Sequence, residues 1–338
     1  MLKKIVNLIL FALLSQSCTR NTHRVFSNST IDTRTREEIK ALNDKLFRAI
    51  HHNDPRMIEK MVSDSLANRS MDEIGKMVET LNTSYTISGY NLFDEFYIVN
   101  NELGMEGVIE SPHSDDNGYI LNYKAPCKET YLSLLSVPVQ KGALLLVAEY
   151  GKYNNEWKLN TLQYGQYSLF GKNASEYFKL AKNCYERSYL IDAVNFMMAS
   201  NTISTPVNEV FHYKKDKEMH AFYSSVMKAA NTKYRLPFTL ENIESKPRIY
   251  KMAPQLGADG FYQAIYYVSS IGLDNIEALK TENEKIKKEV VNQFAGIDQY
   301  KDYIFYWAVN EMPDSQKMIE QYGFVDTLKT QSGKEFPN

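Results

Sequence analysis

The sequence predicts an α+β protein in three parts: helices packed on a curled antiparallel sheet, then a helical segment, then a small domain of order ββαβα. Three changes of pattern indicate this division. Apolar residues first recur at the period of a helix, short β-like runs broken by Gly, Asn and Pro follow, and the helical period returns after Gly171. The chain has 338 residues, enough for two or three domains at roughly 150 residues each.

The first 17 residues predict a signal peptide. Lys3 and Lys4 supply a positive start, and the apolar run from Ile5 to Leu14 is about half of the ~20 residues that a membrane-spanning helix needs. Small or polar residues then lead to Cys18, a pattern that resembles the lipobox of bacterial lipoproteins. The spacing departs from the usual one, because Leu14 lies four residues before the cysteine where three is commoner.

The resemblance implies cleavage before Cys18 and acyl chains, palmitate among them, that hold this cysteine to a membrane. The alternative is ordinary secretion, with Cys18 as a thiol. Residues 18–34 are polar and without a period, which predicts a flexible, lipid-anchored tether. Thr19 follows the cysteine, so an inner-membrane retention aspartate and an acidic surface-export tract are both missing. We therefore expect a location in the bacterial cell envelope, on the outer membrane and facing the periplasm.

Residues 35–170 predict the first folded domain. Apolar residues at helical spacing indicate two or three helices, at Ile39, Leu42, Leu46, Phe47 and Ile50, at Met57, Ile58, Met61, Val62 and Leu66, and at Ile74, Met77, Val78 and Leu81. The β runs that follow are Thr83–Tyr90, Asp94–Asn100, Met105–Glu110, Tyr119–Tyr123, Glu129–Val137, Ala143–Tyr153 and Trp157–Tyr167. This order resembles the NTF2-like or cystatin-like α+β fold.

Residues 171–235 predict a helical segment. The stretch from Ala174 to Asn201 resembles one tetratricopeptide repeat, with packing residues at Tyr177, Leu180, Ala181, Tyr185, Ala193 and Met197. Ser188 stands where that repeat usually has a turn glycine, and no second copy follows at the ~34-residue period. Repeats are stable through stacking, so we expect a lone one to pack on the flanking domains.

Residues 236–331 predict a small C-terminal α+β domain, and residues 332–338 a frayed tail. Its expected strands are Arg248–Met252, Phe261–Ile271 and Tyr303–Val309, and its expected helices are Asp274–Phe294 and Ser315–Gln321. The layout of the three parts resembles Bacteroidota lipoproteins that join an NTF2-like region to TPR-like helices and a small C-terminal domain. That likeness supplies no activity.

Glu149 is the candidate catalytic residue. It shares a strand face with Leu145 and Val147, and a carboxylate inside an apolar pocket has a raised pKa and can act as a general base. NTF2-like isomerases and dehydratases place acids in such a pocket. No histidine or acidic partner for Glu149 is evident from spacing, and a structural role at the end of a strand is the alternative.

Three further groups each allow two interpretations. His113, Asp115 and Asp116 are candidate metal ligands, but Pro112 and Asn117-Gly118 frame an ordinary turn. The second and third cysteines can pair in an oxidising compartment or remain buried thiols; they are Cys127 and Cys184. Aromatic residues in the last domain can line a carbohydrate or lipid groove or form core; they are Tyr262, Tyr266, Tyr267, Phe305, Tyr306 and Trp307.

Composition and motifs exclude several classes of protein. The net charge is -2 and no basic stripe exists, which argues against a nucleic-acid partner. Glycine-rich phosphate loops and the GxSxG elbow are absent from the sequence, so no cofactor is expected. We expect a binding or adaptor module without catalysis, with a protein or small-ligand partner in the envelope. The alternatives are an enzyme with an acid in an NTF2-like pocket and an immunity-type lipoprotein that blocks an exported toxin.

Overall fold

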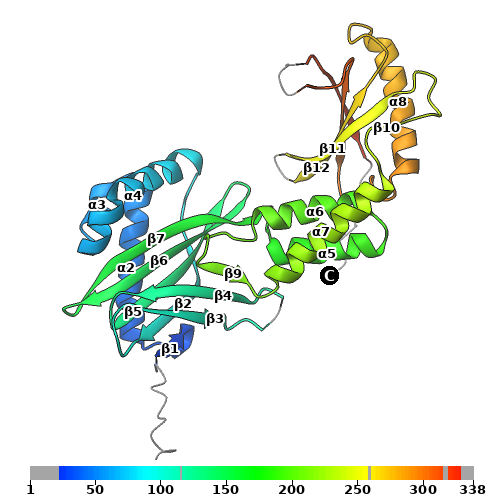
Figure 1. Cartoon of the computed structure of the whole chain (residues 1–338). Helices are drawn as coiled ribbons and strands as arrows, with labels where there is room; N and C mark the ends of the chain where they lie inside the picture. The colour runs from blue at the N-terminus through cyan, green and yellow to red at the C-terminus, as the bar shows by residue number, and fades with distance from the viewer. Residues whose placement is uncertain (1–22, 115, 258–259, 315–318, 329–338) are drawn as a thin grey trace, which may run out of the picture. The chain divides into compact units, whose positions relative to one another are not determined.

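A computed structural model of the chain describes residues 23–114, 116–257, 260–314 and 319–328. The α+β class is confirmed (Figure 1). The chain divides into two compact units: residues up to Ile109, Asn122–Leu135 and Leu146–Gln163 form the first, and Glu110–Leu121, Ser136–Leu145 and Tyr164 onward form the second. The predicted signal peptide, Cys18 and the tail at 332–338 lie outside the described residues.

The largest sheet has six strands in the order β1-β2-β5-β6-β7-β8 and curls into a half-barrel (Figure 1). Its strands are β1 (Arg24–Ser27), β2 (Asn91–Val99), β5 (Glu129–Val139), β6 (Gly142–Tyr153), β7 (Glu156–Leu169) and β8 (Lys172–Asn173). Helix α2 (Thr33–His51) packs on one face, where Asn43 bonds Ser133 of β5 at 3.0 Å and Tyr150 of β6 at 2.9 Å. The prediction of helices packed on a curled antiparallel sheet is therefore confirmed.

Strand β1 differs from the prediction, because residues 24–27 were expected in the flexible tether. They pair antiparallel with residues 96–99 of β2, so that this part of the chain is an edge strand. Phe26 stacks on Tyr97 with ring centroids 5.9 Å apart, and this contact accounts for the ordering of a short polar segment. A 3-10 turn at Asn28–Thr30 then leads to Asp32, whose side chain caps α2.

The second predicted helix is also different. It ends as α3 (Pro55–Glu59), and a new helix, α4 (Asp64–Ser84), begins after the cap residue Ser63. Between them, the backbone amide of Leu159 donates to the Met61 carbonyl at 2.8 Å. The backbone amide of Ser63 donates to the Leu159 carbonyl at 2.9 Å. These bonds to β7 replace helical ones, so Met61 and Val62 do not continue the helix, and Leu66 belongs to α4. The predicted strand at 83–90 is the end of α4 and a segment without strand.

A small sheet of order β3-β4-β9 contains β3 (Met105–Glu110), β4 (Tyr119–Ala125) and β9 (Phe211–Tyr213). β9 has three residues and lies inside the stretch that was expected to be helical. It pairs with residues 119–121 of β4, and Tyr119 stacks on Phe211 at 4.7 Å. The contact is long-range, which is why the local pattern does not show it.

Helices α5 (Ala174–Glu186), α6 (Leu190–Thr202) and α7 (Asp216–Lys233) follow one another (Figure 1). Asn173 and Glu176 form a capping box at the start of α5. Ser188, in the turn between α5 and α6, has a φ of 61°. This left-handed conformation explains why glycine would be favoured there. The likeness of this helix pair to a tetratricopeptide repeat stays a prediction.

The last sheet has five strands in the order β10-β11-β12-β13-β14: β10 (Phe238–Thr239), β11 (Arg248–Leu256), β12 (Phe261–Val268), β13 (Tyr303–Val309) and β14 (Tyr322–Thr327). β12 and β13 are parallel and joined by α8 (Ile276–Gln293). The predicted order ββαβα is not confirmed: residues 322–327 form a further strand that pairs antiparallel with β13, and residues 315–318 of the predicted last helix lie outside the described residues. Tyr322, Phe324 and Asp326 alternate with more exposed neighbours, the period of a strand, and 319–321 are not helical.

One apolar core joins this sheet to the helices before it. Apolar residues of α8 are fully buried against residues of β12 and β13, at Leu279, Ile286, Val290, Ile265, Tyr267, Ile304 and Tyr306. Leu190 of α6 and Ala230 of α7 belong to the same core. The helices and the last sheet therefore stabilise each other, as expected for a helix pair that cannot bury both of its faces alone.

Candidate functional site

The largest hollow described here runs along α2 in the first unit. This α2 cleft has a volume of about 980 Å³. Its walls are one side of α2 and residues 89–95, which lead into β2 and begin it; they contribute Thr33, Arg36, Glu37, Lys40, Ala41, Asn43, Asp44, Phe47, Arg48, Gly89, Tyr90, Asn91, Leu92 and Glu95. The α2 residues recur every three to four positions because only one face of the helix lies on the sheet.

Charged side chains of the α2 cleft are largely paired. Arg36 donates to Glu95 at 2.5 Å, and Lys40 donates to Asp44 at 2.7 Å. Burial alone would raise the pKa of Asp44, but hydrogen bonds from Lys40 and Tyr90 outweigh it and hold that pKa below its usual value. Asp44 is therefore held in its ionised form by its two partners.

Three large apolar or aromatic side chains also line the α2 cleft. The rings of Phe47 and Tyr90 lie 5.2 Å apart, and the Tyr90 hydroxyl donates to Asp44 at 2.5 Å. Leu92 is 44% exposed. Protein-binding surfaces commonly combine such side chains with charged ones.

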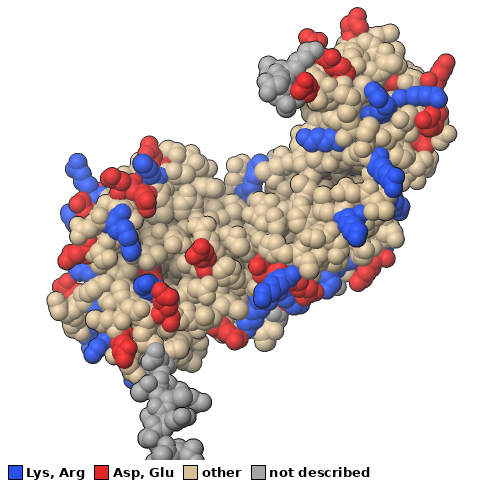
Figure 2. Space-filling model, in the orientation of Figure 1, with Lys and Arg blue, Asp and Glu red and all other residues tan. Residues whose placement is uncertain are grey.

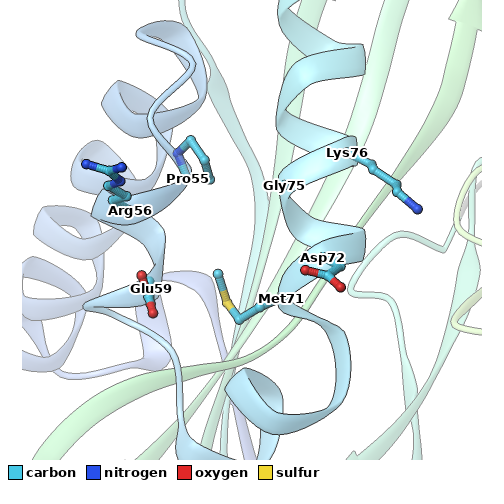
Figure 3. A pocket seen from close by; sticks show the side chains of 7 residues that line it. All are labelled: Pro55, Arg56, Glu59, Met71, Asp72, Gly75 and Lys76. Atoms are coloured by element: carbon cyan, nitrogen blue, oxygen red, sulfur yellow. The ribbon is translucent and has the colours of Figure 1, made fainter.

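A second, more open hollow lies between α3 and α4 (Figure 3). Its volume is about 440 Å³, and it is lined by Pro55, Arg56, Glu59, Met71, Asp72, Gly75 and Lys76. Figure 3 shows Met71 extending from α4 into the gap, with Arg56 and Glu59 on α3. Ser70 has non-helical backbone angles, so α4 is kinked directly before Met71. The lining is mostly charged and exposed, and nothing in it is arranged for chemistry.

A third hollow, the aromatic cleft, belongs to the second unit and has a volume of about 230 Å³. Six of its eleven lining residues are aromatic; the full set is Phe170, Lys172, Tyr177, Leu180, Phe196, Gly260, Phe261, Tyr262, Tyr300, Lys301 and Asp302. They come from the β7–β8 turn, from α5 and α6, and from β12 and the segment before β13. Tyr177 contacts the rings of both Phe196 and Phe261.

A buried ion pair stands beside the aromatic cleft. The Lys301 ammonium donates to Asp192 of α6 at 2.5 Å and to the carbonyl of Ile297 at 2.7 Å. Both charged side chains are 4% exposed. Burial raises the pKa of Asp192 despite the opposing effect of Lys301. Two of the three ammonium protons are used by these bonds.

Glu149 is buried on β6, at 6% exposure. Burial raises the pKa of its carboxyl to about 8, and the charge of Arg69 acts in the opposite direction. It lines none of the three hollows described above. Beside it on β6, Gly151 lies against the Cys127 thiol and the Asn160 amide, and Tyr153 donates to Asn160 at 2.9 Å.

The candidate metal ligands His113 and Asp116 have other contacts. Asp116 pairs with Lys215, which lowers the pKa of Asp116, and Asp115 lies outside the described residues. The His113 ring lies 6.1 Å from that of Tyr119. In the part of the chain that the structure describes, no group of three or more His, Cys, Asp and Glu residues could hold a metal.

The two cysteines and most of the repeat-like residues are buried. Cys127 and Cys184 are free, buried thiols, and burial raises the pKa of each. The predicted packing residues of the helix pair are buried at Tyr177, Leu180, Ala181, Ala193 and Met197, whereas Tyr185 is 38% exposed. Tyr185 lies against Phe222 of α7 instead.

Sequence reasoning missed the residues of the α2 cleft. Arg36, Lys40 and Asp44 look like the solvated face of a helix, Tyr90 looks like the end of a strand, and Leu92 lies between two expected strands. Their spacing on one side of α2 was the available signal, but the second wall comes from a segment about 50 residues later. Among the residues described, no helix is long and apolar enough to cross a membrane. No family model and no curated protein sequence matches this chain.

Proposed function

We propose that the protein is a lipid-anchored binding or adaptor module of the bacterial envelope, and that it holds a polypeptide segment of a partner in the α2 cleft. The observation that carries the proposal is the lining of the cleft, which combines the large apolar or aromatic side chains of Phe47, Tyr90 and Leu92 with charged residues from α2 and β2. The anchor at Cys18 and the location on the outer membrane, facing the periplasm, rest on the resemblance to lipoproteins.

A polypeptide suits the cleft better than a small molecule does. Pockets for small molecules are mostly apolar and measure roughly 300–1,000 Å³. The α2 cleft, at about 980 Å³, is at the upper end of that range, and six of its fourteen lining residues are charged. A partner segment can match such alternating charges along its length, as protein interfaces do at their rims.

The same lining supports binding rather than catalysis as the proposal. A general base needs a pKa near the working pH, and Asp44 in the cleft has a lowered pKa because its partners stabilise the ionised form. Mixed charge also disfavours a nucleic-acid partner: Figure 2 shows basic and acidic side chains interspersed over the visible face.

Site-specific photocrosslinking in the native envelope tests the proposal. A photoreactive residue in place of Ala41, which is exposed and lines the cleft, is expected to capture a protein. A matched probe in place of Asn68, exposed on α4 outside the cleft, is expected not to capture it. Adding Leu92→Asp should reduce capture from position 41 by about tenfold, since central apolar residues carry most interface energy.

Equal capture of the same proteins from positions 41 and 68 would show that the α2 cleft is not the site. The identity of a captured partner also separates two members of the binding class. An envelope component indicates an adaptor, and an exported toxin indicates the immunity-type alternative.

A second candidate function is enzymatic, and the position of Glu149 favours it. The carboxyl is buried and its pKa is raised to about 8, as general acids and bases require. Comparing wild type with Glu149→Gln in a screen for hydrolase and isomerase activity tests this candidate. An activity lost in the variant would replace the binding proposal.

A further inference from the structure

The turn between β7 and β8 places a phenylalanine where the backbone disfavours it. Ser168 pairs with Asn173 and Leu169 with Lys172, so Phe170 and Gly171 form a two-residue hairpin loop. Both have positive φ, 48° and 75°, as in a type I′ turn. Asn or Gly is favoured at the first of these positions, and a bulky residue is disfavoured. The ring of Phe170 must therefore contribute something that the turn itself does not need.

The ring of Phe170 lines the aromatic cleft. It meets Phe261 edge to face at 5.3 Å, and Phe261 meets Tyr177 in the same way at 5.9 Å. Tyr300, on another wall, also has a positive φ of 56°, and Arg187 donates to its hydroxyl at 2.5 Å. Two of the six aromatic residues of this cleft thus adopt a disfavoured backbone conformation, which is characteristic of positions kept for a ligand.

The volume of the aromatic cleft limits its occupant to about one ring. At about 230 Å³ it is smaller than the ~300–1,000 Å³ of sites for drug-sized ligands. Tyr262, at its edge, also belongs to the face of the last sheet that carries Phe305, with the two rings 5.8 Å apart. A chain of rings can therefore enter the cleft with one ring and continue over that face.

Charges in the cleft decide the chemistry of that ring. Lys172 and Lys301 disfavour a cation, and Asp302 disfavours an anion. An apolar ring, such as a phenylalanine side chain, would remove water from these groups without replacing its hydrogen bonds, and a tyrosine side chain has a single hydroxyl with which to replace them. A ring with several hydroxyls replaces them, because each hydroxyl can accept from the remaining Lys301 proton or donate to the Asp302 carboxylate.

From this lining we infer that the aromatic cleft binds a neutral sugar ring of a glycan. The C–H face of the ring lies on the aromatic walls around Phe170 and Phe261, and its hydroxyls bond Lys301 and Asp302. The site is separate from the α2 cleft, since it uses none of the same residues. It gives the protein a second kind of ligand.

The test uses the full chain and the methyl glycosides of glucose, mannose, galactose and N-acetylglucosamine as probes. Saturation-transfer NMR is expected to show binding of at least one glycoside, with the strongest transfer to its ring C–H protons. Phe170→Asn removes the ring while giving the turn a favoured residue, so the fold is retained. It should weaken binding by about tenfold, the effect of one lost aromatic contact.

Asp302→Asn is the second variant, because it removes the carboxylate charge at nearly constant shape and should also weaken binding about tenfold. Tyr185→Asn is the matched control: Tyr185 is a partly exposed aromatic of α5 outside the cleft, and this variant should bind like wild type.

Absence of binding by all four glycosides overturns the inference. Unchanged binding in both cleft variants also overturns it, as does tighter binding of N-acetyltyrosine amide than of every glycoside. Capture from position 41 is independent of all these outcomes.

Discussion

The Glu149 carboxyl is a buried acid, and burial is the main influence on its pKa. Burial raises its pKa from 4.5 to about 8, so the folded protein holds a proton that the unfolded chain releases. Below pH 4.5 both states are protonated and the group has no effect on stability. As the pH rises from 4.5 through 8, the unfolded state ionises first and the free energy of unfolding falls.

Glu149→Gln should remove this pH dependence while keeping the shape of the side chain. At pH 5 we expect the variant and wild type to differ little in their free energy of unfolding. At pH 8.5 we expect the variant to be more stable by about 2–4 kcal/mol, because each pH unit of difference is worth ~1.4 kcal/mol. Urea unfolding at the two pH values measures this.

Glu156→Gln supplies the control, since Glu156 is exposed and pairs only with Lys158 at the surface. Its effect should be small and similar at both pH values. A Glu149→Gln variant that is less stable than wild type at pH 8.5 would contradict the expected burial of the acid.

Single residues also show where sequence reasoning reaches its limit. The sequence places Glu149 on an apolar strand face, and it is buried there. Burial of Asp192 and Lys301 was not predicted, because one is on α6 and the other precedes β13. Charged residues are usually exposed, so only the three-dimensional neighbourhood reveals such a pair.

The packing of α5 against α6 can be tested most directly among the helices. Ala193 is fully buried in α6, in one apolar cluster with Cys184 of α5 and Val226 of α7. Ala193→Phe should overpack this contact and lower the free energy of unfolding by about 1–3 kcal/mol. Chemical denaturation of the full chain measures the change.

Met198→Phe is the comparison for that experiment, because Met198 lies on the same helix and is 36% exposed. It should change stability by less than about 0.5 kcal/mol. If Ala193→Phe is as stable as wild type, the close packing of the helix pair is wrong, and the tetratricopeptide likeness loses its support.

Elements with a long, regular pattern were predicted best. Helices α2, α5 and α8 follow apolar seams at helical spacing, and β5, β6 and β7 are long apolar strands near their expected positions. Short elements were missed or misassigned: β1, β9 and β14 have between three and six residues each. A strand of that length depends on its partner for stability, so its own sequence carries little signal.

The two clefts belong to different units of the chain, the α2 cleft to the first and the aromatic cleft to the second. An adaptor needs two separate binding sites, because it must hold two ligands at once. Neither cleft could be predicted as a whole: Tyr262 was a candidate groove residue and lines the aromatic cleft, but the other residues of the two clefts were not candidates for a groove. Each has walls from segments far apart in the sequence, and both wall sets look like ordinary helix faces or strand cores when considered alone.

Membrane attachment is the prediction that concerns the whole molecule. Wild-type protein expressed in a bacterium with lipoprotein-processing enzymes should incorporate labelled palmitate and fractionate with membranes. Cys18→Ala should abolish both, because the thiol of Cys18 is the proposed attachment point for the acyl chains. One acyl chain anchors only marginally and two or more hold firmly, so the variant should move almost completely to the soluble fraction.

Cys127→Ala is the matched control: this thiol is buried and free in the first unit, and its loss should leave labelling and fractionation unchanged. A Cys18→Ala protein that still fractionates wholly with membranes would show that the lipoprotein prediction is wrong.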